Sequence, residues 1–124
     1  MVIDTSVLLA ILFNEEHGRW CIENLEGAVS ELRMSTVNYA ETLILLEDRQ
    51  PQLFEDLRAE IDALPIRFVS PDLPQAAVAA KARLRYPLNL GDCFVYALAV
   101  VEGCSIITLD ADFLKTDRPV LLPS

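Results

Sequence analysis

Short apolar segments alternate with longer helical segments along this chain, and that alternation most constrains its fold. Strands that alternate with helices favour a parallel sheet, because parallel neighbours need a crossover connection, which is usually a helix. We therefore expect an α/β fold, a three-layer α/β/α sandwich with a mainly parallel central sheet. The segments expected to form its strands are Met1–Ile3, Leu32–Ser35, Ile66–Val69, Ser105–Leu109 and, as an edge strand, Val120–Leu122.

Capping and breaking residues suggest where the helices begin and end. Hydroxyl side chains cap free backbone N–H groups, so Thr5 or Ser6 is expected to cap the first helix and Ser35 or Thr36 the third. Pro51 suits the first turn of a further helix. The helices expected on this basis are Val7–Phe13, Glu16–Leu25, Val37–Arg49, Pro51–Leu64, Leu73–Leu84 and Gly91–Glu102.

Length and composition indicate one folded domain over residues 1–124. A chain of 124 residues, 52% hydrophobic, can bury one core, and no repeat, linker or low-complexity segment divides it. The longest apolar run, Cys93–Val101, is far shorter than the roughly 18 residues of a membrane span. We expect no membrane association and no secretory signal.

The three cysteines are an odd number, widely spaced, with no C-x-x-C pair, which argues against a disulfide framework and a thiolate metal site. A reducing cytoplasm is the simplest location. The net charge of −9 is unusual for a nucleic-acid binder, which normally carries a basic surface. Either the partner is not nucleic acid, or cations and a basic partner protein offset the acidity.

Two aspartates follow predicted strands at opposite ends of the chain. Asp4 comes directly after Met1–Ile3, and Asp110 directly after Ser105–Leu109. Ligands of open parallel sheets bind at the carboxyl ends of the strands, so both acids are expected at one edge. Taken singly, each is equally compatible with a helix cap or a turn.

Glu41 is expected to lie in an apolar stripe of its helix. Its neighbours three or four positions away include Val37, Ile44 and Leu45, and no Lys or Arg stands at those spacings. A buried carboxylate is unfavourable unless it is paired, protonated or bound to metal. The alternative is that Glu41 lies at the margin of the stripe and reaches water.

Two further acids are less distinctive. Asp92 opens the Gly91–Glu102 helix, where an acid also serves as an ordinary cap. Asp112 is either a fifth ligand or a loop acid that supports the others. If these acids converge, their repulsion raises their pKa values or opposes folding. A hard divalent cation relieves that conflict, and Mg²⁺ with its waters suits phosphodiester chemistry.

Four motifs together resemble the PIN-domain family, and most closely its VapC-type toxins. They are V-I-D-T-S-V-L-L-A at residues 2–10, N-Y-A-E-T at 38–42, L-G-D-C-F-V-Y-A-L-A at 90–99 and T-L-D-A-D-F at 108–113. The motifs stand in the family's order and span nearly the whole chain. The segment 14–19 departs from the family, whose members often carry a proline-containing acidic turn there.

The resemblance implies a function and a set of site residues. The family's acidic quartet, which binds Mg²⁺ or Mn²⁺ and catalyses the reaction, falls on Asp4, Glu41, Asp92 and Asp110. Thr5 or Ser6 matches the family's hydroxyl that positions water or phosphate, and Asp112 matches an additional acid of the last motif. Family members hydrolyse single-stranded or looped RNA, usually as homodimers, and a cognate antitoxin with a basic tail inhibits them.

Other interpretations remain to be weighed. A catalytically silent PIN-like binding module is the main alternative, and a phosphoacceptor receiver domain a weaker one, because Lys115 matches its late lysine poorly. Cys93 is interpreted as a buried structural thiol, and His17 as a surface residue. Lys81, Arg83 and Arg85 form a basic group that is either an RNA contact or plain solvated surface; the site proposed here does not include them.

Overall fold

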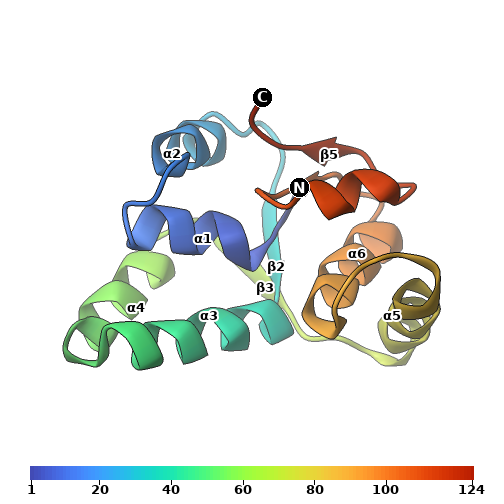
Figure 1. Ribbon diagram of the computed structural model, residues 1–124, viewed down its shortest axis with the longest axis horizontal. Helices are drawn as coiled ribbons and strands as arrows, with labels where there is room; N and C mark the ends of the chain where they lie inside the picture. The colour runs from blue at the N-terminus through green and yellow to red at the C-terminus, as the bar shows by residue number, and fades with distance from the viewer.

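The computed structural model describes residues 1–124 and contains a five-stranded sheet in the order β3-β2-β1-β4-β5. All four strand pairings are parallel, which confirms the predicted parallel α/β architecture (Figure 1). The strands are β1 Val2–Ile3, β2 Leu32–Ser35, β3 Ile66–Val69, β4 Ile106–Ile107 and β5 Val120–Leu121.

Six α-helices and two 3₁₀ helices connect these strands. The α-helices are α1 Thr5–Leu12, α2 Gly18–Glu26, α3 Thr36–Arg49, α4 Phe54–Asp62, α5 Leu73–Arg85 and α6 Leu90–Glu102. The 3₁₀ helices are η1 Pro51–Leu53 and η2 Ala111–Lys115. No helix is long and apolar enough to cross a membrane.

Local capping agrees with the sequence in one helix and differs in another. Ser35 caps α3 as predicted, since its hydroxyl accepts a hydrogen bond from the Val37 amide. The predicted capping by Thr5 or Ser6 is wrong, because α1 already begins at Thr5 and Asp4 holds the N-cap position. The hydroxyl of Ser6 instead donates a hydrogen bond to the Asp4 carboxylate.

The helices cover both faces of the sheet and form two separate apolar cores. One core joins α1 to α4 with sheet residues such as Ile3 and Met34, and the other joins α5 and α6 with Val2 and Ile106. Successive residues of a strand point to opposite faces, which explains why Val2 and Ile3 belong to different cores. Figure 1 shows α1–α4 gathered on one side of the sheet and α5–α6 on the other.

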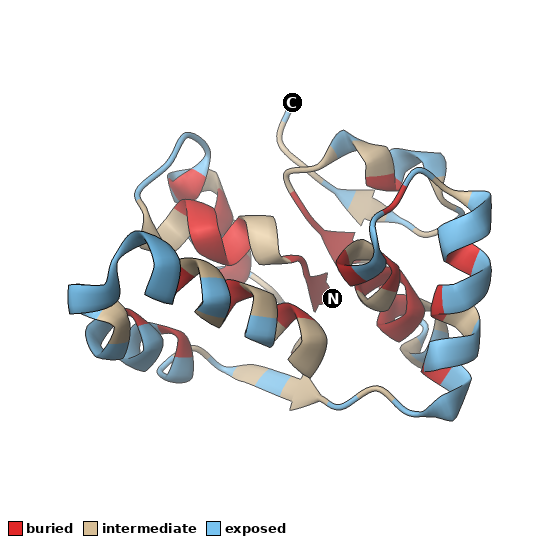
Figure 2. Cartoon of the chain, turned by 60° about the horizontal axis from the view of Figure 1, so that its bottom comes forward, coloured by how far each residue is buried: buried red, intermediate tan, exposed pale blue.

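Helix α6 is the most deeply buried helix of the molecule. Its central residues, Val95 to Ala99, are all buried. Figure 2, in which buried residues are red, shows that such residues lie in the interior of both halves of the molecule. Helix α5 packs along α6 and separates much of its surface from solvent. This burial accounts for the long apolar run in the sequence, and it fixes the start of α6 at the edge of the sheet.

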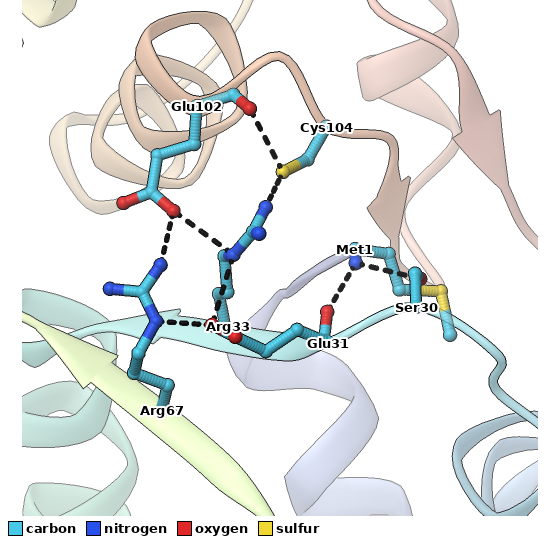
Figure 3. A network of polar contacts seen from close by, with 7 residues as sticks. All are labelled: Met1, Ser30, Glu31, Arg33, Arg67, Glu102 and Cys104. Carbon is cyan, nitrogen blue, oxygen red and sulfur yellow. Dashed lines mark hydrogen bonds and ion pairs between the residues drawn. The ribbon is translucent and has the colours of Figure 1, made fainter.

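A charged network holds the other end of α6 (Figure 3). The carboxylate of Glu102, the last residue of α6, pairs with Arg33 of β2 and with Arg67 of β3. Arg67 also pairs with Glu31, and Arg33 contacts the thiol of Cys104. The hydrogen bond from Arg67 lowers the pKa of Glu31. These pairs tie the C-terminal end of α6 to the two strands beneath it.

Candidate active site

The topological switch point of the sheet, where the strand order reverses, lies between β1 and β4. The chain proceeds from β1 through β2 to β3 in one direction, whereas β4 and β5 lie on the other side of β1. Asp4 follows β1, and Asp110 lies three residues beyond the end of β4. Open α/β sheets bind ligands at such a switch point, at the carboxyl ends of the strands. The predicted convergence of these two acids at one edge therefore agrees with the topology.

Asp4 is the most buried acid of the site, with 4% of its surface exposed. Its Oδ2 accepts hydrogen bonds from Ser6 Oγ at 2.7 Å and from Thr108 Oγ1 at 2.8 Å. Burial raises the pKa of Asp4, and the charges of Asp110 and Glu41 raise it further, against the effect of the two hydroxyls. The hydroxyls orient the carboxylate without neutralising it.

Glu41 is half-buried, although not for the reason expected from the sequence. The expected apolar stripe is wrong, because Ile44 is 66% exposed and the buried residues of α3 are Asn38, Thr42 and Leu46. The Oε1 atom of Glu41 instead accepts hydrogen bonds from Asn38 Nδ2 at 2.8 Å and Thr5 Oγ1 at 3.1 Å. Neutral donors therefore hold this carboxylate.

Asp92 stands in the first turn of α6, at the mouth of the site. It forms a capping box with Asn89, whose side chain accepts a hydrogen bond from the Asp92 amide at 2.8 Å. Burial, reinforced by the charge on Asp4, raises the pKa of Asp92 to about 7, and the charges on Asp110 and Glu41 contribute in the same direction. The four acids of the predicted quartet thus affect one another electrostatically.

Asp110 is the N-cap residue of η2, and backbone and side-chain hydrogen bonds hold it in place. Its Oδ1 accepts a hydrogen bond from the Asp112 amide at 2.8 Å, and its amide donates to Thr108 Oγ1 at 3.0 Å. The carboxylate of Asp112 pairs with Lys115 at 3.2 Å and is 44% exposed. Asp112 as a metal ligand stays a prediction.

None of the four quartet acids forms a salt bridge with Lys, Arg or His. The seven ion pairs of the structure involve other carboxylates. Carboxylate oxygens without a cationic partner are the donors that hard divalent cations prefer, so the chemistry of the set fits such an ion. No three of these side chains lie close enough to hold an ion directly as positioned. Mg²⁺ usually keeps several waters, so one or two carboxylates suffice.

Sequence reasoning missed two residues that the structure places at the site. Thr108 lies within the last motif, yet its hydroxyl serves both Asp4 and the Asp110 amide. Asn38 opens the second motif and donates to Glu41. In the sequence, each of these polar residues stands between two hydrophobic neighbours, and this was the available signal. The expectations for Cys93, which is buried, and His17, which is exposed, are confirmed.

A pocket of about 370 Å³ adjoins the site and shares Ser6 and Leu109 with it. Arg49, His17 and two glutamates, Glu15 and Glu16, also line it. Arg49 also stacks on Phe13, 5.3 Å from the ring centre, and forms no ion pair. The pocket therefore carries an available cationic group close to the acidic cluster. The larger cavity, about 700 Å³ between α3 and α4, contains no quartet residue.

The parallel α/β/α sandwich and its unpaired acids at the switch point define a class: small α/β proteins with an acidic site suited to divalent cations. The chain belongs to the PIN-domain family, which matches residues 1–119. It is 39% identical to ribonuclease VapC30 of Mycobacterium tuberculosis, over 99% of this chain and 100% of that protein. These comparisons identify it as a VapC-type PIN domain.

Solved structures agree with the assignment at the level of the fold. Mycobacterium tuberculosis VapC20, a toxin described as cleaving the sarcin–ricin loop, superposes with a TM-score of 0.83 at 16% identity, covering 98% of both chains. A chain of a toxin–antitoxin complex from Klebsiella pneumoniae superposes with a TM-score of 0.78 at 20% identity, covering 99% of this chain and 97% of that one.

Proposed function

We propose that this chain is an endoribonuclease, dependent on Mg²⁺ or Mn²⁺, that acts as the toxin of a toxin–antitoxin pair. The observation that supports the proposal is that hydrogen bonds through Thr108, Thr5 and Asn38 link the surroundings of the four carboxylates, none of which pairs with a cationic side chain. The name of the 39% identical relative supports RNA as the substrate. The three free, buried cysteines suit a reducing compartment such as the cytoplasm.

Asp4, Glu41, Asp92 and Asp110 would hold the metal, one or two of them directly and the others through its bound waters. A bound divalent cation would polarise the scissile phosphate and help to generate the attacking hydroxide. The protein's own residues preorganise this chemistry. Ser6 and Thr108 fix the orientation of Asp4, and the backbone of η2 fixes Asp110, so these carboxylates need little rearrangement when substrate arrives.

An antitoxin is the proposed protein partner. The Klebsiella pneumoniae neighbour is described as a toxin–antitoxin complex, which supports a partner of that kind. The net charge of −9 favours a basic partner segment, because opposite charges steer association. An arginine of that segment would find unpaired carboxylates at the site and would form charge-assisted hydrogen bonds there.

The test is cleavage of end-labelled RNA by purified protein with Mn²⁺, with Mg²⁺ or with EDTA. We expect metal-dependent cleavage, and we expect Asp92→Asn to lower the rate by at least about 100-fold, because a metal ligand is lost. Asp48→Asn is the matched control, since it removes an exposed carboxylate elsewhere and should retain full activity. Folded protein that cleaves no RNA under any of these conditions would favour the alternative of a silent binding module.

A further inference from the structure

The Glu41 carboxylate is held between α3 and the start of α6, by contacts with Asn38 and Gly91. Asn38, one turn before Glu41, is fully buried. Its side-chain nitrogen lies 2.8 Å from Glu41 Oε1 and 2.9 Å from the carbonyl oxygen of Gly91. An amide NH₂ has two hydrogens, and here each has one acceptor. One side chain thus joins an acid of the quartet to the residue immediately before another, Asp92.

Gly91 has no side chain, and this leaves space for the Glu41 carboxylate. A Cβ placed there would lie 2.7 Å from Glu41 Oε1 and closer still to Oε2, inside the distance that real Cβ atoms keep. The backbone of Gly91 does not require glycine for its own conformation, because its φ is not positive. The requirement for glycine at this position therefore comes from the Glu41 carboxylate.

A further contact holds the Glu41 carboxylate from the side of α1, and Thr42 is not part of it. The Thr5 hydroxyl lies 3.1 Å from Glu41 Oε1 and 3.3 Å from the Asn38 carbonyl oxygen. The Thr42 hydroxyl donates to the same carbonyl at 2.8 Å. The Oδ1 atom of Asn38 is buried with no hydrogen-bond partner. An unsatisfied buried oxygen is unfavourable, so the two hydrogen bonds donated by the NH₂ group must offset its cost.

We propose that Asn38 and Gly91 are positioning residues that set the place of the Glu41 carboxylate relative to Asp92 at the start of α6. This inference rests on the proposed function, in which both acids act at the metal. Asn38 supplies the hydrogen bond that holds the carboxylate, and Gly91 supplies the space that it occupies. Neither residue is placed in contact with RNA.

Two substitutions remove these contributions separately. Asn38→Leu has similar branching but no donor, so Glu41 loses its shorter hydrogen bond and keeps only the one from Thr5, while the space at residue 91 is unchanged. Gly91→Ala keeps both Asn38 donors and fills the space of the carboxylate. The Gly91→Ala variant should remain stable, because the side chain that must move is flexible at its end and alanine favours a helix more than glycine does. It therefore keeps the test decisive if Asn38→Leu fails to fold.

Thr42→Val is the matched control. It removes a buried hydrogen bond on the same helix, to the backbone of Asn38, without touching Glu41. A general loosening of α3 would affect this variant as much as Asn38→Leu. Thermal unfolding of all three variants, with metal removed, reports how much stability each loses.

Two readouts distinguish positioning from a purely structural role. The first is Mn²⁺ binding to metal-free protein, followed by the electron paramagnetic resonance of free Mn²⁺. The second is RNA cleavage, separated into kcat and KM. Loss of such supporting contacts commonly weakens metal binding or activity by about 10- to 100-fold. We expect Asn38→Leu and Gly91→Ala to show that loss in Mn²⁺ affinity and kcat, with KM for RNA within about twofold and Thr42→Val unchanged.

Folded Gly91→Ala protein with Mn²⁺ affinity and kcat within about twofold of wild type would overturn the proposal, as would an equal loss in Thr42→Val. If wild-type protein cleaves no RNA, the proposed function fails, whereas the Mn²⁺ titration still decides whether these residues position Glu41. The two failures are therefore distinguishable.

Discussion

At the scale of single residues, Asp92 is the acid whose ionisation should respond most clearly to pH. Burial and the charge on Asp4 raise its pKa to about 7 in the folded protein, from an ordinary value of 3.8. A raised pKa means that the folded state binds the proton more tightly than the unfolded state does. The resulting stability is fully present below about pH 4 and is lost as the pH rises through about 7.

The corresponding prediction compares wild-type protein with Asp92→Asn in EDTA. Asparagine cannot ionise, so the Tm of wild type should fall relative to that of Asp92→Asn between about pH 4 and pH 7, by several degrees or about 1 kcal/mol. Differential scanning fluorimetry at each pH measures this difference. Asp48→Asn should show no such trend. A constant difference between wild type and Asp92→Asn would contradict the raised pKa.

Arg49 carries a second prediction at this scale. It lines the pocket that shares Ser6 with the acidic site, and it forms no ion pair. RNA cleaved at the site would extend past this pocket, so a phosphate contact with Arg49 is expected to contribute to binding. Arg49→Ala should raise KM by about tenfold with little change in kcat, because a charge-assisted hydrogen bond is lost.

The control for Arg49 is Arg19→Ala, which removes an exposed arginine paired with Glu23 and should leave KM unchanged. Raising the salt concentration should reduce the difference between wild type and Arg49→Ala, since phosphate contacts weaken with ionic strength. Equal KM values for wild type and Arg49→Ala at low salt would exclude this contact.

Single residues also show how far sequence reasoning could reach. The positions of Asp4 and Asp110 followed from topology, because strand ends in a parallel sheet share an edge. The interpretation of Glu41 used apolar spacing, and Ile44 proved to be exposed. The bonds from Thr108 to Asp4 and from Asn38 to the Gly91 carbonyl could not be assigned, because these partners lie 104 and 53 residues away. The bond from Asn38 to Glu41 spans three residues, a spacing that brings side chains together on a helix.

At the scale of elements, α6 is fixed at both of its ends. Asn38 binds the carbonyl of Gly91 at its start, and Glu102 pairs with Arg33 and Arg67 at its end (Figure 3). Asp92 lies on the first turn, so tilting of this helix would move it relative to Asp4. The charged network at the C-terminal end of α6 therefore helps to set the position of Asp92 at the other end of this helix.

Glu102→Gln tests this element-scale role. It removes the charge that two arginines share, at a position with only 21% of the side chain exposed. We expect a loss of about 1 kcal/mol in unfolding free energy, the upper range for a pair that is not fully buried. High salt should destabilise wild type more than the variant, and chemical denaturation at two salt concentrations measures both effects. Glu23→Gln, at an exposed pair with Arg19, should change stability little.

The element boundaries were predicted less well than the element order. Of the predicted strand Ser105–Leu109, only Ile106–Ile107 is a strand, although the Ser105 carbonyl and the Thr108 amide still bond to the neighbouring chain segments. The amide of Leu109 donates to the Ser6 hydroxyl instead of to a strand. The predicted helix from Pro51 begins as the 3₁₀ turn η1 and becomes α4 only at Phe54. Hydrophobic period and proline locate an element, but competing side-chain hydrogen bonds decide its last residue.

At the scale of the whole molecule, apolar residues remain on the surface. Ile44 is 66% exposed, Leu84 92% and Leu90 63%. Large exposed apolar side chains are common in subunits that associate. The homodimer implied by the family resemblance stays a prediction, because a single chain does not test it.

The net charge of −9 predicts that this protein binds basic peptides. Asp4, Glu41, Asp92 and Asp110 have no cationic partner, so a basic peptide should be attracted to the same edge that would bind metal. An arginine-rich peptide is therefore expected to inhibit RNA cleavage, and arginine can bind a carboxylate through two parallel hydrogen bonds. Raising Mn²⁺ should relieve the inhibition if arginine and metal compete for these carboxylates.

The control is a peptide of equal length with glutamine in place of each arginine, which should not inhibit. Because the attraction is electrostatic, the inhibition constant should increase steeply with ionic strength. A peptide that merely sequesters RNA would inhibit equally in the presence of an unrelated ribonuclease, so that enzyme is run in parallel. Inhibition that is specific to this protein but independent of Mn²⁺ would place the peptide elsewhere on the acidic surface, and the carboxylates would not be its binding site.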